Sequence, residues 1–163
     1  MNTAFLLTGG NLGDRLFNLE QARTLVGMHC GEIINQSSIY KTAAWGFKDQ
    51  PDFYNQALQI KTELFPEELM KNLLLVEEKM GRKRTLKMGP RIIDIDILLM
   101  NDLIFNSPDL VIPHPRLPER RFALTPLTDI AANIIHPVLQ KSILELLKEC
   151  KDDLPVYKIS TEK

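Results

Sequence analysis

The sequence predicts a single α+β domain, and three observations support this prediction. The chain has 163 residues, which is enough for one domain with a substantial core. Hydrophobic residues make up 44% of it and charged residues 25%, as is typical of globular proteins. Short apolar runs alternate with segments of helical periodicity, but not in the regular β–α–β rhythm of a doubly wound sheet. We therefore expect residues 1–163 to form one α+β domain.

The N-terminal half is expected to hold three strands and two helices. The run TAFLLT at 3–8 is apolar and ends at a glycine pair, which predicts a buried strand followed by a glycine-rich loop. Apolar residues then recur at helical spacing to about Met28. Two strands, over 33–42 and 53–63, and a second helix that starts at Pro66 and ends near Gly81 complete this half.

The C-terminal half contains a strongly apolar strand that we expect at 91–100. Within RIIDIDILLM, Ile93, Ile95, Ile97 and Leu99 should face the core, because side chains alternate along a strand. Residues 102–105 are expected to turn back beside this strand. Four prolines between 108 and 118 argue against regular structure there. Helices are expected at about 120–132, where Pro126 should interrupt or end the helix, and at 139–150.

Asp94 and Asp96 share the other face of the predicted strand. Two carboxylates on one face of an apolar strand repel each other and lose hydration. A divalent cation relieves that conflict, and carboxylates that hold Mg²⁺ against substrate phosphates are common. The alternative is a polar outer face with two ordinary surface aspartates, since Asp-x-Asp alone is too short to be specific.

Basic residues flank this acidic pair on both sides. Six lysines or arginines lie between 79 and 91, and His114, Arg116, Arg120 and Arg121 follow the pair. Arginine forks and lysine charges beside carboxylates suit a polyphosphate with bound Mg²⁺. Taken alone, the basic run is more commonly a solvated loop, and an RNA-binding surface is a further alternative. The run has no interleaved aromatic residues, which argues against nucleic acid.

The charge and composition of the chain argue against a nucleic-acid-binding, membrane or secreted protein. The net charge is −1, whereas a protein dedicated to nucleic acid or anionic membrane would usually be more basic. No stretch approaches the length of a membrane span, and the first residues lack the basic region of a signal peptide. Cys30 and Cys150 form no metal-type cluster and are expected to be reduced thiols, with a disulfide between them as the alternative. We expect a cytoplasmic protein and a monomer.

Five segments, in order along the chain, carry a resemblance to a known family. They are GGNLG at 9–13, QPDFYN at 50–55, GRKR at 81–84, GPRIIDIDIL at 89–98, and Pro113-His114 followed by RRF at 120–122. Together they resemble the 6-hydroxymethyl-7,8-dihydropterin pyrophosphokinase family of folate biosynthesis. The chain contains no Walker-type phosphate loop, no G-x-G-x-x-G turn and no protein-kinase catalytic loop.

The resemblance implies a ferredoxin-like core, with an antiparallel-type sheet flanked by helices. It also implies that ATP gives its β,γ-diphosphate to the hydroxymethyl group of the pterin, and that AMP leaves. Asp94 and Asp96 would hold two Mg²⁺ ions that bridge the ATP phosphates and the pterin hydroxyl. ATP and the dihydropterin are the implied partners, without nucleic acid or membrane.

The same resemblance assigns roles to the other site residues. ATP would be bound by Glu77, Arg82, Arg84, Arg91, Ile97, His114 and Arg120, and among these Arg82, Arg84 and Arg91 are expected to act in catalysis. The pterin would be bound by Thr42, Ala43, Trp45, Phe53, Asn55 and Phe122. An amide can pair with the polar edge of a heterocycle, and phenylalanine rings can stack on its faces. Arg82 and Arg84 would lie on a loop that closes over the substrates.

Four positions depart from the common pattern of that family. Met88 stands where a tryptophan is common, Gly10 where a serine is, Phe53 where a tyrosine is and Ala43 where a proline is. None of these changes removes a metal ligand. Two rival functions stay open: another Mg²⁺-dependent ATP enzyme, such as a nucleotidyltransferase or pyrophosphatase, and a ferredoxin-like RNA-binding module that uses the basic run.

Overall fold

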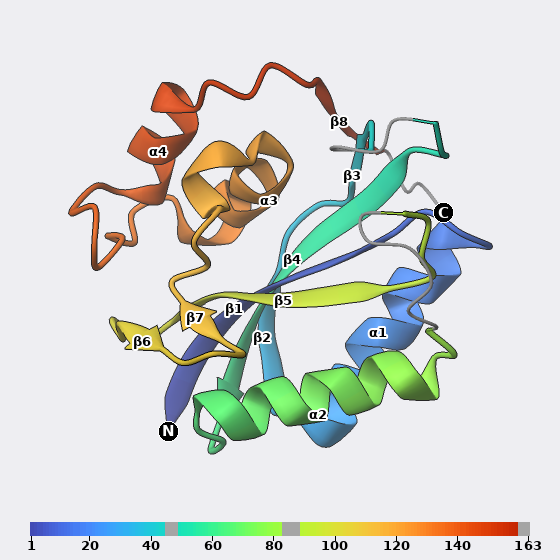
Figure 1. Cartoon of the computed structure of the whole chain (residues 1–163), viewed down its shortest axis with the longest axis horizontal. Helices are drawn as coiled ribbons and strands as arrows, with labels where there is room; N and C mark the ends of the chain where they lie inside the picture. Colours follow the sequence, from blue (N-terminus) through green and yellow to red (C-terminus); the bar gives the residue numbers. More distant parts are fainter. Residues whose placement is uncertain (45–48, 83–88, 160–163) are drawn as a thin grey trace.

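The computed structural model describes residues 1–44, 49–82 and 89–159. Its elements along the chain are β1 (Asn2–Gly10), α1 (Arg15–His29), β2 (Glu32–Gln36), β3 (Tyr40–Thr42), β4 (Phe53–Thr62), α2 (Pro66–Lys79), β5 (Asp94–Met100), β6 (Phe105–Asn106), β7 (Val111–Ile112), a 3-10 turn (Leu117–Glu119), α3 (Arg121–Ala131), α4 (Ile143–Glu149) and β8 (Val156–Lys158). Figure 1 shows α1 and α2 on one face of a sheet and α3 and α4 on the other. None of the helices described has the length and apolarity that a membrane span requires.

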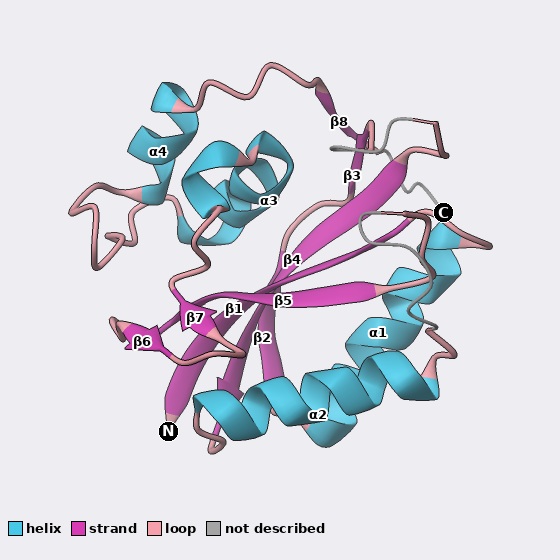
Figure 2. Cartoon of the chain, in the orientation of Figure 1, coloured by secondary structure: helices cyan, strands magenta, loops and turns pink. Residues whose placement is uncertain are grey.

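The main sheet is antiparallel at every strand pair that the described residues form. Its order is β5-β1-β4-β3-β8, and β2 pairs with the same edge of β4 as β3 does. If β2 and β3 are taken as one interrupted strand, the chain reads β-α-β-β-α-β from β1 to β5, which is the ferredoxin-like order. Figure 2 shows these strands between the two helical layers. The predicted α+β fold is therefore confirmed.

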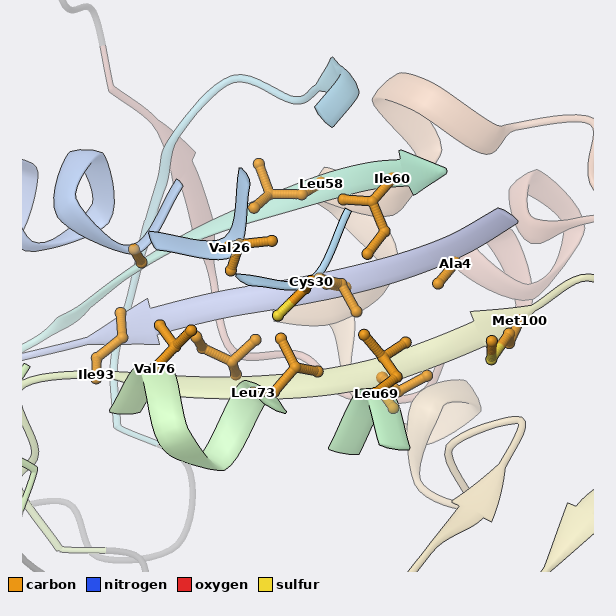
Figure 3. Packing of buried hydrophobic residues seen from close by; sticks show 14 of the residues in the cluster. Ala4, Val26, Cys30, Leu58, Ile60, Leu69, Leu73, Val76, Ile93 and Met100 are labelled. Atoms are coloured by element: carbon orange, nitrogen blue, oxygen red, sulfur yellow. The ribbon is translucent and has the colours of Figure 1, made fainter. Parts of the chain in front are cut away.

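Two apolar clusters hold the helices against the sheet. The larger lies between the sheet and helices α1 and α2, and it includes Leu58 and Ile60 of β4 and Leu69 and Leu73 of α2 (Figure 3). The smaller lies under α3 and α4 and includes Leu7 of β1. Each fully buried side chain of this size contributes about 1.5–3 kcal/mol, so both faces of the sheet are well anchored.

Strand β1 is longer than predicted, because Gly9 and Gly10 belong to it. Gly9 pairs with Asn55 of β4 on one side and with Asp94 of β5 on the other. A Cβ at Gly10 would strike the backbone carbonyl of Ile92, so only glycine fits so close to the chain that enters β5. The predicted glycine-rich loop shrinks to residues 11–14.

The predicted strand over 33–42 consists of two strands, β2 and β3. Ser37 lies between them, and its side chain accepts a hydrogen bond from the backbone N–H of Ala57 at 2.9 Å. A hydroxyl thus replaces a backbone acceptor in the ladder, so the pairing with β4 stops and resumes at Tyr40.

Strand β5 begins later than predicted, at Asp94, and its register against β1 shifts between Phe5 and Leu6. The shift inserts one extra residue into β5 and reverses the alternation beyond it. Leu99 therefore packs in the smaller cluster, and its predicted place beside Ile93, Ile95 and Ile97 is wrong. Those three isoleucines lie in the larger cluster as predicted.

The C-terminal half differs from the prediction at several elements. Strand β6 pairs with β7, so the chain after β5 forms a separate hairpin instead of returning along β5. Helix α3 continues through Pro126, whereas α4 starts only at Ile143 because Ser142 and Glu145 form a reciprocal cap. Strand β8 was not predicted, since three residues paired to β3 carry no apolar periodicity. Cys30 and Cys150 are free thiols.

Candidate active site

One row of paired residues crosses the sheet on the face that α3 covers. Asp94 of β5 pairs with Gly9 of β1, and Gly9 pairs with Asn55 of β4. Asn55 pairs in turn with Tyr40 of β3. Side chains of paired residues point to the same face of a sheet. A carboxylate and an amide from distant parts of the sequence therefore face the same side, with a glycine between them.

Asn55 is buried, with 4% of its surface exposed, and its amide is oriented by Thr42. The Nδ2 group of Asn55 donates a hydrogen bond to the Oγ1 atom of Thr42 at 3.1 Å. Phe53, also buried, pairs with Thr42 across the two strands. A Cβ at Gly9 would overlap the Oδ1 atom of Asn55, so the missing side chain makes room for this amide. An amide, a hydroxyl and a ring that were predicted to bind the pterin thus lie together, and their contact with the pterin stays a prediction.

Asp94 is held by two arginines. The Arg82 guanidinium donates to Oδ1 of Asp94 at 2.8 Å, and Nε of Arg91 lies 3.4 Å from Oδ2. The same Nη1 atom of Arg82 also donates to Glu77 at 2.9 Å. Glu77 is buried, and its other carboxylate oxygen accepts the backbone N–H of Ile95 at 2.7 Å. Glu77 therefore links the end of α2 and Arg82 to the start of β5.

Asp96 lies two residues farther along the same face of β5. Burial, together with the negative charge of Asp94, raises the pKa of Asp96 to about 7. Arg120 and Arg91 oppose this shift but do not cancel it. The ionised pair is thus an unfavourable arrangement in the isolated protein, and a bound cation would relieve it.

His114 lies near this charged group but is neutral at physiological pH. Burial lowers its pKa to about 4, and the charge of Arg120 adds to the effect. Its Nδ1 atom accepts the backbone N–H of Arg116 at 3.2 Å. In the neutral ring the proton is then on Nε2, which makes His114 a hydrogen-bond donor and not a positive charge. Burial also lowers the pKa of Arg120, partly offset by the charge of Asp96.

Each phenylalanine of the predicted pterin pocket is accompanied by an arginine. The Arg91 guanidinium lies 4.8 Å from the centre of the Phe53 ring. The Arg120 guanidinium lies 5.5 Å from the centre of the Phe122 ring. Both distances are within the range of cation–π attraction. The predicted phosphate and pterin subsites therefore adjoin one another.

Not all the predicted site residues can be placed with this group. Trp45 and Arg84 lie outside the described residues. Ala43 is exposed just after β3. Ile97 is buried in the larger cluster, with its side chain on the face opposite Asp96. Its predicted contact with ATP stays a prediction.

Two residues of the site were not predicted, Asn11 and Arg15. The Asn11 side chain donates to Gln50 and to the carbonyl of Pro51 at 2.8 and 2.9 Å, and it accepts the N–H of Arg91 at 2.9 Å. Arg15 donates to the carbonyl of Asp52 at 2.9 Å. They tie the start of α1 to the segment that leads into β4. Their position in and just after the GGNLG motif was the available signal.

The chain is thus an α+β protein of ferredoxin-like fold, with carboxylates, arginines and a buried amide grouped at one face of its sheet. Comparison with known proteins narrows this class. The chain belongs to the 7,8-dihydro-6-hydroxymethylpterin-pyrophosphokinase (HPPK) family, which it matches over residues 5–132. The resemblance carried by the five short motifs is therefore confirmed.

The match covers most of this chain in each of three curated relatives, but very different shares of the relatives themselves. The 2-amino-4-hydroxy-6-hydroxymethyldihydropteridine pyrophosphokinase of Aquifex aeolicus is 41% identical over 149 residues, which covers 91% of this chain and 92% of that protein. The Bacillus subtilis protein of the same name is 41% identical over 134 residues, covering 82% and 80%. Folic acid synthesis protein fol1 of Pneumocystis carinii is 38% identical over 91% of this chain, but the match spans 20% of that longer protein.

A solved structure shows the same fold. The crystal structure of Plasmodium falciparum HPPK-DHPS with pteroate superposes with a TM-score of 0.75 at 19% sequence identity. The match covers 91% of this chain and 44% of that one. This likeness supports the ferredoxin-like topology read from the strand order.

Proposed function

We propose that this chain transfers the β,γ-diphosphate of ATP to the hydroxymethyl group of 6-hydroxymethyl-7,8-dihydropterin and releases AMP. The observation that supports this is the row Asp94, Gly9 and Asn55, which brings a carboxylate and a buried amide to the same face of the sheet. The pterin hydroxyl oxygen would attack the β-phosphorus while the bond to the α,β-bridging oxygen breaks. AMP leaves with that oxygen, and the hydroxyl proton is released.

Asp94 and Asp96 fit Mg²⁺ that arrives with ATP. Among the described residues, no group of three or more His, Cys, Asp or Glu side chains could hold a metal ion. Mg²⁺ commonly uses one or two carboxylates and completes its shell with phosphate oxygens and water. We propose that this pair holds two Mg²⁺ ions, which would neutralise the phosphates and orient the reacting groups.

Arginines and His114 would bind the rest of the triphosphate. The buried Nε atom of Arg82 has no hydrogen-bond partner among the described residues, and such an atom is costly unless a ligand satisfies it. A phosphate oxygen would supply the acceptor. His114 would donate from Nε2 as a neutral ring. Arg91 and Arg120 would keep their positive charge beside the phosphates.

Asn55, Thr42 and the two phenylalanines would orient the pterin. The hydrogen bond from Asn55 to Thr42 would hold the amide in one orientation, and the other polar atoms of the amide would pair with the edge of the pterin. Phe53 and Phe122 would stack on the ring. Exclusion of water by this clamp would favour attack by the pterin hydroxyl over hydrolysis of ATP.

Product analysis tests the proposed reaction. The protein is incubated with ATP, Mg²⁺ and 6-hydroxymethyl-7,8-dihydropterin, and AMP and the diphosphorylated pterin are expected in equal amounts. Release of inorganic pyrophosphate would instead support a nucleotidyltransferase or a pyrophosphatase. Salt-dependent RNA binding without ATP turnover would support the RNA-binding alternative.

Asn55→Ala is expected to weaken pterin binding by about 1–3 kcal/mol, because the polar edge of the ring loses its partner. ATP binding should change little. Titration of each ligand separately measures both effects. Gln59→Ala, on the same strand and face but away from the site, is the control. Equal losses for both ligands would place Asn55 outside the pterin pocket.

Arg82→Ala is expected to slow turnover by about 100-fold, the effect of removing one charge-stabilising donor from a transition state. Affinity for a non-hydrolysable ATP analogue should change less, because Arg82 is engaged with Asp94 and Glu77 in the free protein. Single-turnover rates and analogue titration separate the two quantities. Lys79→Ala, an exposed cation at the end of α2, should leave both unchanged. A loss confined to affinity would contradict the catalytic role.

We also infer that the chain acts as a monomer in the cytoplasm and without nucleic acid. The net charge of −1 supports the last point, and the free thiols of Cys30 and Cys150 are compatible with a reducing compartment. Sedimentation equilibrium of the purified protein tests the oligomeric state.

A further inference from the structure

A side-chain hydrogen bond joins β3 to the far end of α3. The Tyr40 hydroxyl lies 2.9 and 2.8 Å from Oδ1 and Oδ2 of Asp129 and donates to this carboxylate. The backbone N–H of Ser38 also donates to Asp129, at 3.1 Å. Tyr40 is buried, whereas Asp129 is an exposed residue whose carboxylate reaches the edge of β3. The bond therefore bridges a buried strand and a surface position of a helix.

Both ends of this bridge belong to elements that carry pterin-pocket residues. Tyr40 pairs with Asn55, and Thr42 follows it two residues later on the same face of β3. On α3, Phe122 and Asp129 lie about two turns apart and hence on the same side of the helix. Figure 2 shows α3 beside β3 and β4, and these elements are in contact.

The backbone pairing of β3 does not fix its distance from α3. Strand β3 is only three residues long, and its outer neighbour β8 is equally short. Its backbone bonds to β4 set its position within the sheet, but they do not set the height of a helix above the sheet. Side chains that reach from the sheet to the helix must set that height. Tyr40 is such a side chain, and its hydroxyl makes a directional hydrogen bond to Asp129 on α3.

We propose that Tyr40 and Asp129 are a positioning pair for the pterin: their hydrogen bond sets the separation between Phe122 on α3 and the Thr42–Asn55 pair on the sheet. The proposal rests on the proposed function, because Phe122, Thr42 and Asn55 are assigned there to the pterin. The pair touches neither substrate. Loss of this hydrogen bond should loosen α3 against the sheet and weaken pterin binding, while Asp94 of the proposed phosphate subsite keeps its contacts with Arg82 and Arg91.

Tyr40→Phe is the primary test, because it removes the hydroxyl and keeps the buried ring. The exposed Asp129 carboxylate stays hydrated in this variant, so no buried charge is left unpaired. The KM for the pterin should rise about fivefold, the effect of one lost hydrogen bond, while kcat and the KM for ATP stay within about twofold. Asp129→Ala should give the same pattern. Asp129→Asn keeps an acceptor for the tyrosine and should restore most of the pterin affinity.

Two controls separate positioning from general loss of structure. Tyr157→Phe makes the same chemical change on the exposed face of β8 and should leave both KM values unchanged. Thr128→Ala removes a hydrogen bond within α3, to the carbonyl of Leu124, and leaves the hydrogen bonds of Asp129 to Tyr40 and Ser38 in place. Even where Thr128→Ala lowers the melting temperature as much as Tyr40→Phe does, it should not change the KM for the pterin.

The outcomes distinguish this proposal from the function on which it rests. If the wild-type protein forms no AMP with ATP and the pterin, the proposed function fails. If the wild type is active and Tyr40→Phe and Asp129→Ala both keep the pterin KM, the positioning role is overturned. Equal rises in the KM for ATP and the pterin would also overturn it. If Tyr40→Phe does not fold, the two Asp129 variants decide the question.

Discussion

Replacing Asp96 or Asp94 with alanine is expected to lower turnover by at least about 100-fold and to leave the fold intact. Each change removes a carboxylate proposed to hold Mg²⁺, and the loss should fall on the transition state, where charge on the phosphates is redistributed. Steady-state kinetics at saturating ATP and pterin measure it. Asp102→Ala, in the exposed turn after β5, is the control and should retain full activity.

The thermal stability of the Asp96 variant tells a loss of metal binding apart from a loss of folding. The raised pKa of Asp96 means that its ionised form is disfavoured in the folded, metal-free protein. Asp96→Ala should therefore unfold at the same temperature as the wild type or a higher one.

If either aspartate variant kept its activity within about tenfold, or roughly 1.4 kcal/mol of barrier, the metal assignment would be wrong.

Gly9→Ala is expected to reduce the pterin affinity by at least about tenfold, more than the change of one methyl group would suggest. The new Cβ would overlap the Oδ1 atom of Asn55, whose buried side chain is bonded to Thr42. The amide must then leave the orientation that faces the pterin, and its hydrogen bond to Thr42 is lost. The backbone of Gly9 is ordinary strand, so the cost arises from this contact and not from a forbidden backbone conformation.

Titration of the pterin in the absence of ATP measures the effect of Gly9→Ala directly. Gly27→Ala is the matched control, because a Cβ at that helical position meets nothing within 4 Å. The control should retain affinity and gain about 0.4–1 kcal/mol of stability. A Gly9→Ala protein that binds the pterin normally would show that the Asn55 amide is not held in place for the ligand.

The family can be recognised from the N-terminal and central motifs of the amino-acid sequence. GPRIIDIDIL at 89–98 shows two carboxylates on alternate positions of an apolar strand, and this short-range geometry depends only on the backbone. The basic residues on both sides of it indicate phosphate. The pterin, by contrast, follows only from the resemblance, because no spacing of Asn55, Phe53 and Phe122 indicates a particular heterocycle.

Errors in the predicted elements arise where long-range pairing overrides local pattern. Leu99 was assigned to the wrong face because the register shift opposite Phe5 depends on β1, which lies far away in sequence. Gly9 and Gly10 were assigned to a loop because glycine is rare in strands, yet the Asn55 side chain beside Gly9 and the Ile92 carbonyl beside Gly10 leave no room for a Cβ. Strand β8 exists because β3 offers it an edge.

The sequence by itself determined which functional groups this protein has: a carboxylate pair on an amphipathic strand, the arginines around it and the motifs of the HPPK family. Only the tertiary structure decided how those groups meet. The adjacency of Asp94, Gly9 and Asn55 follows from strand register, the raised pKa of Asp96 from burial, and the bridge from Tyr40 to Asp129 from the docking of α3. Local patterns are set by neighbouring residues, whereas register, burial and docking are set by the packing of segments that are distant in sequence.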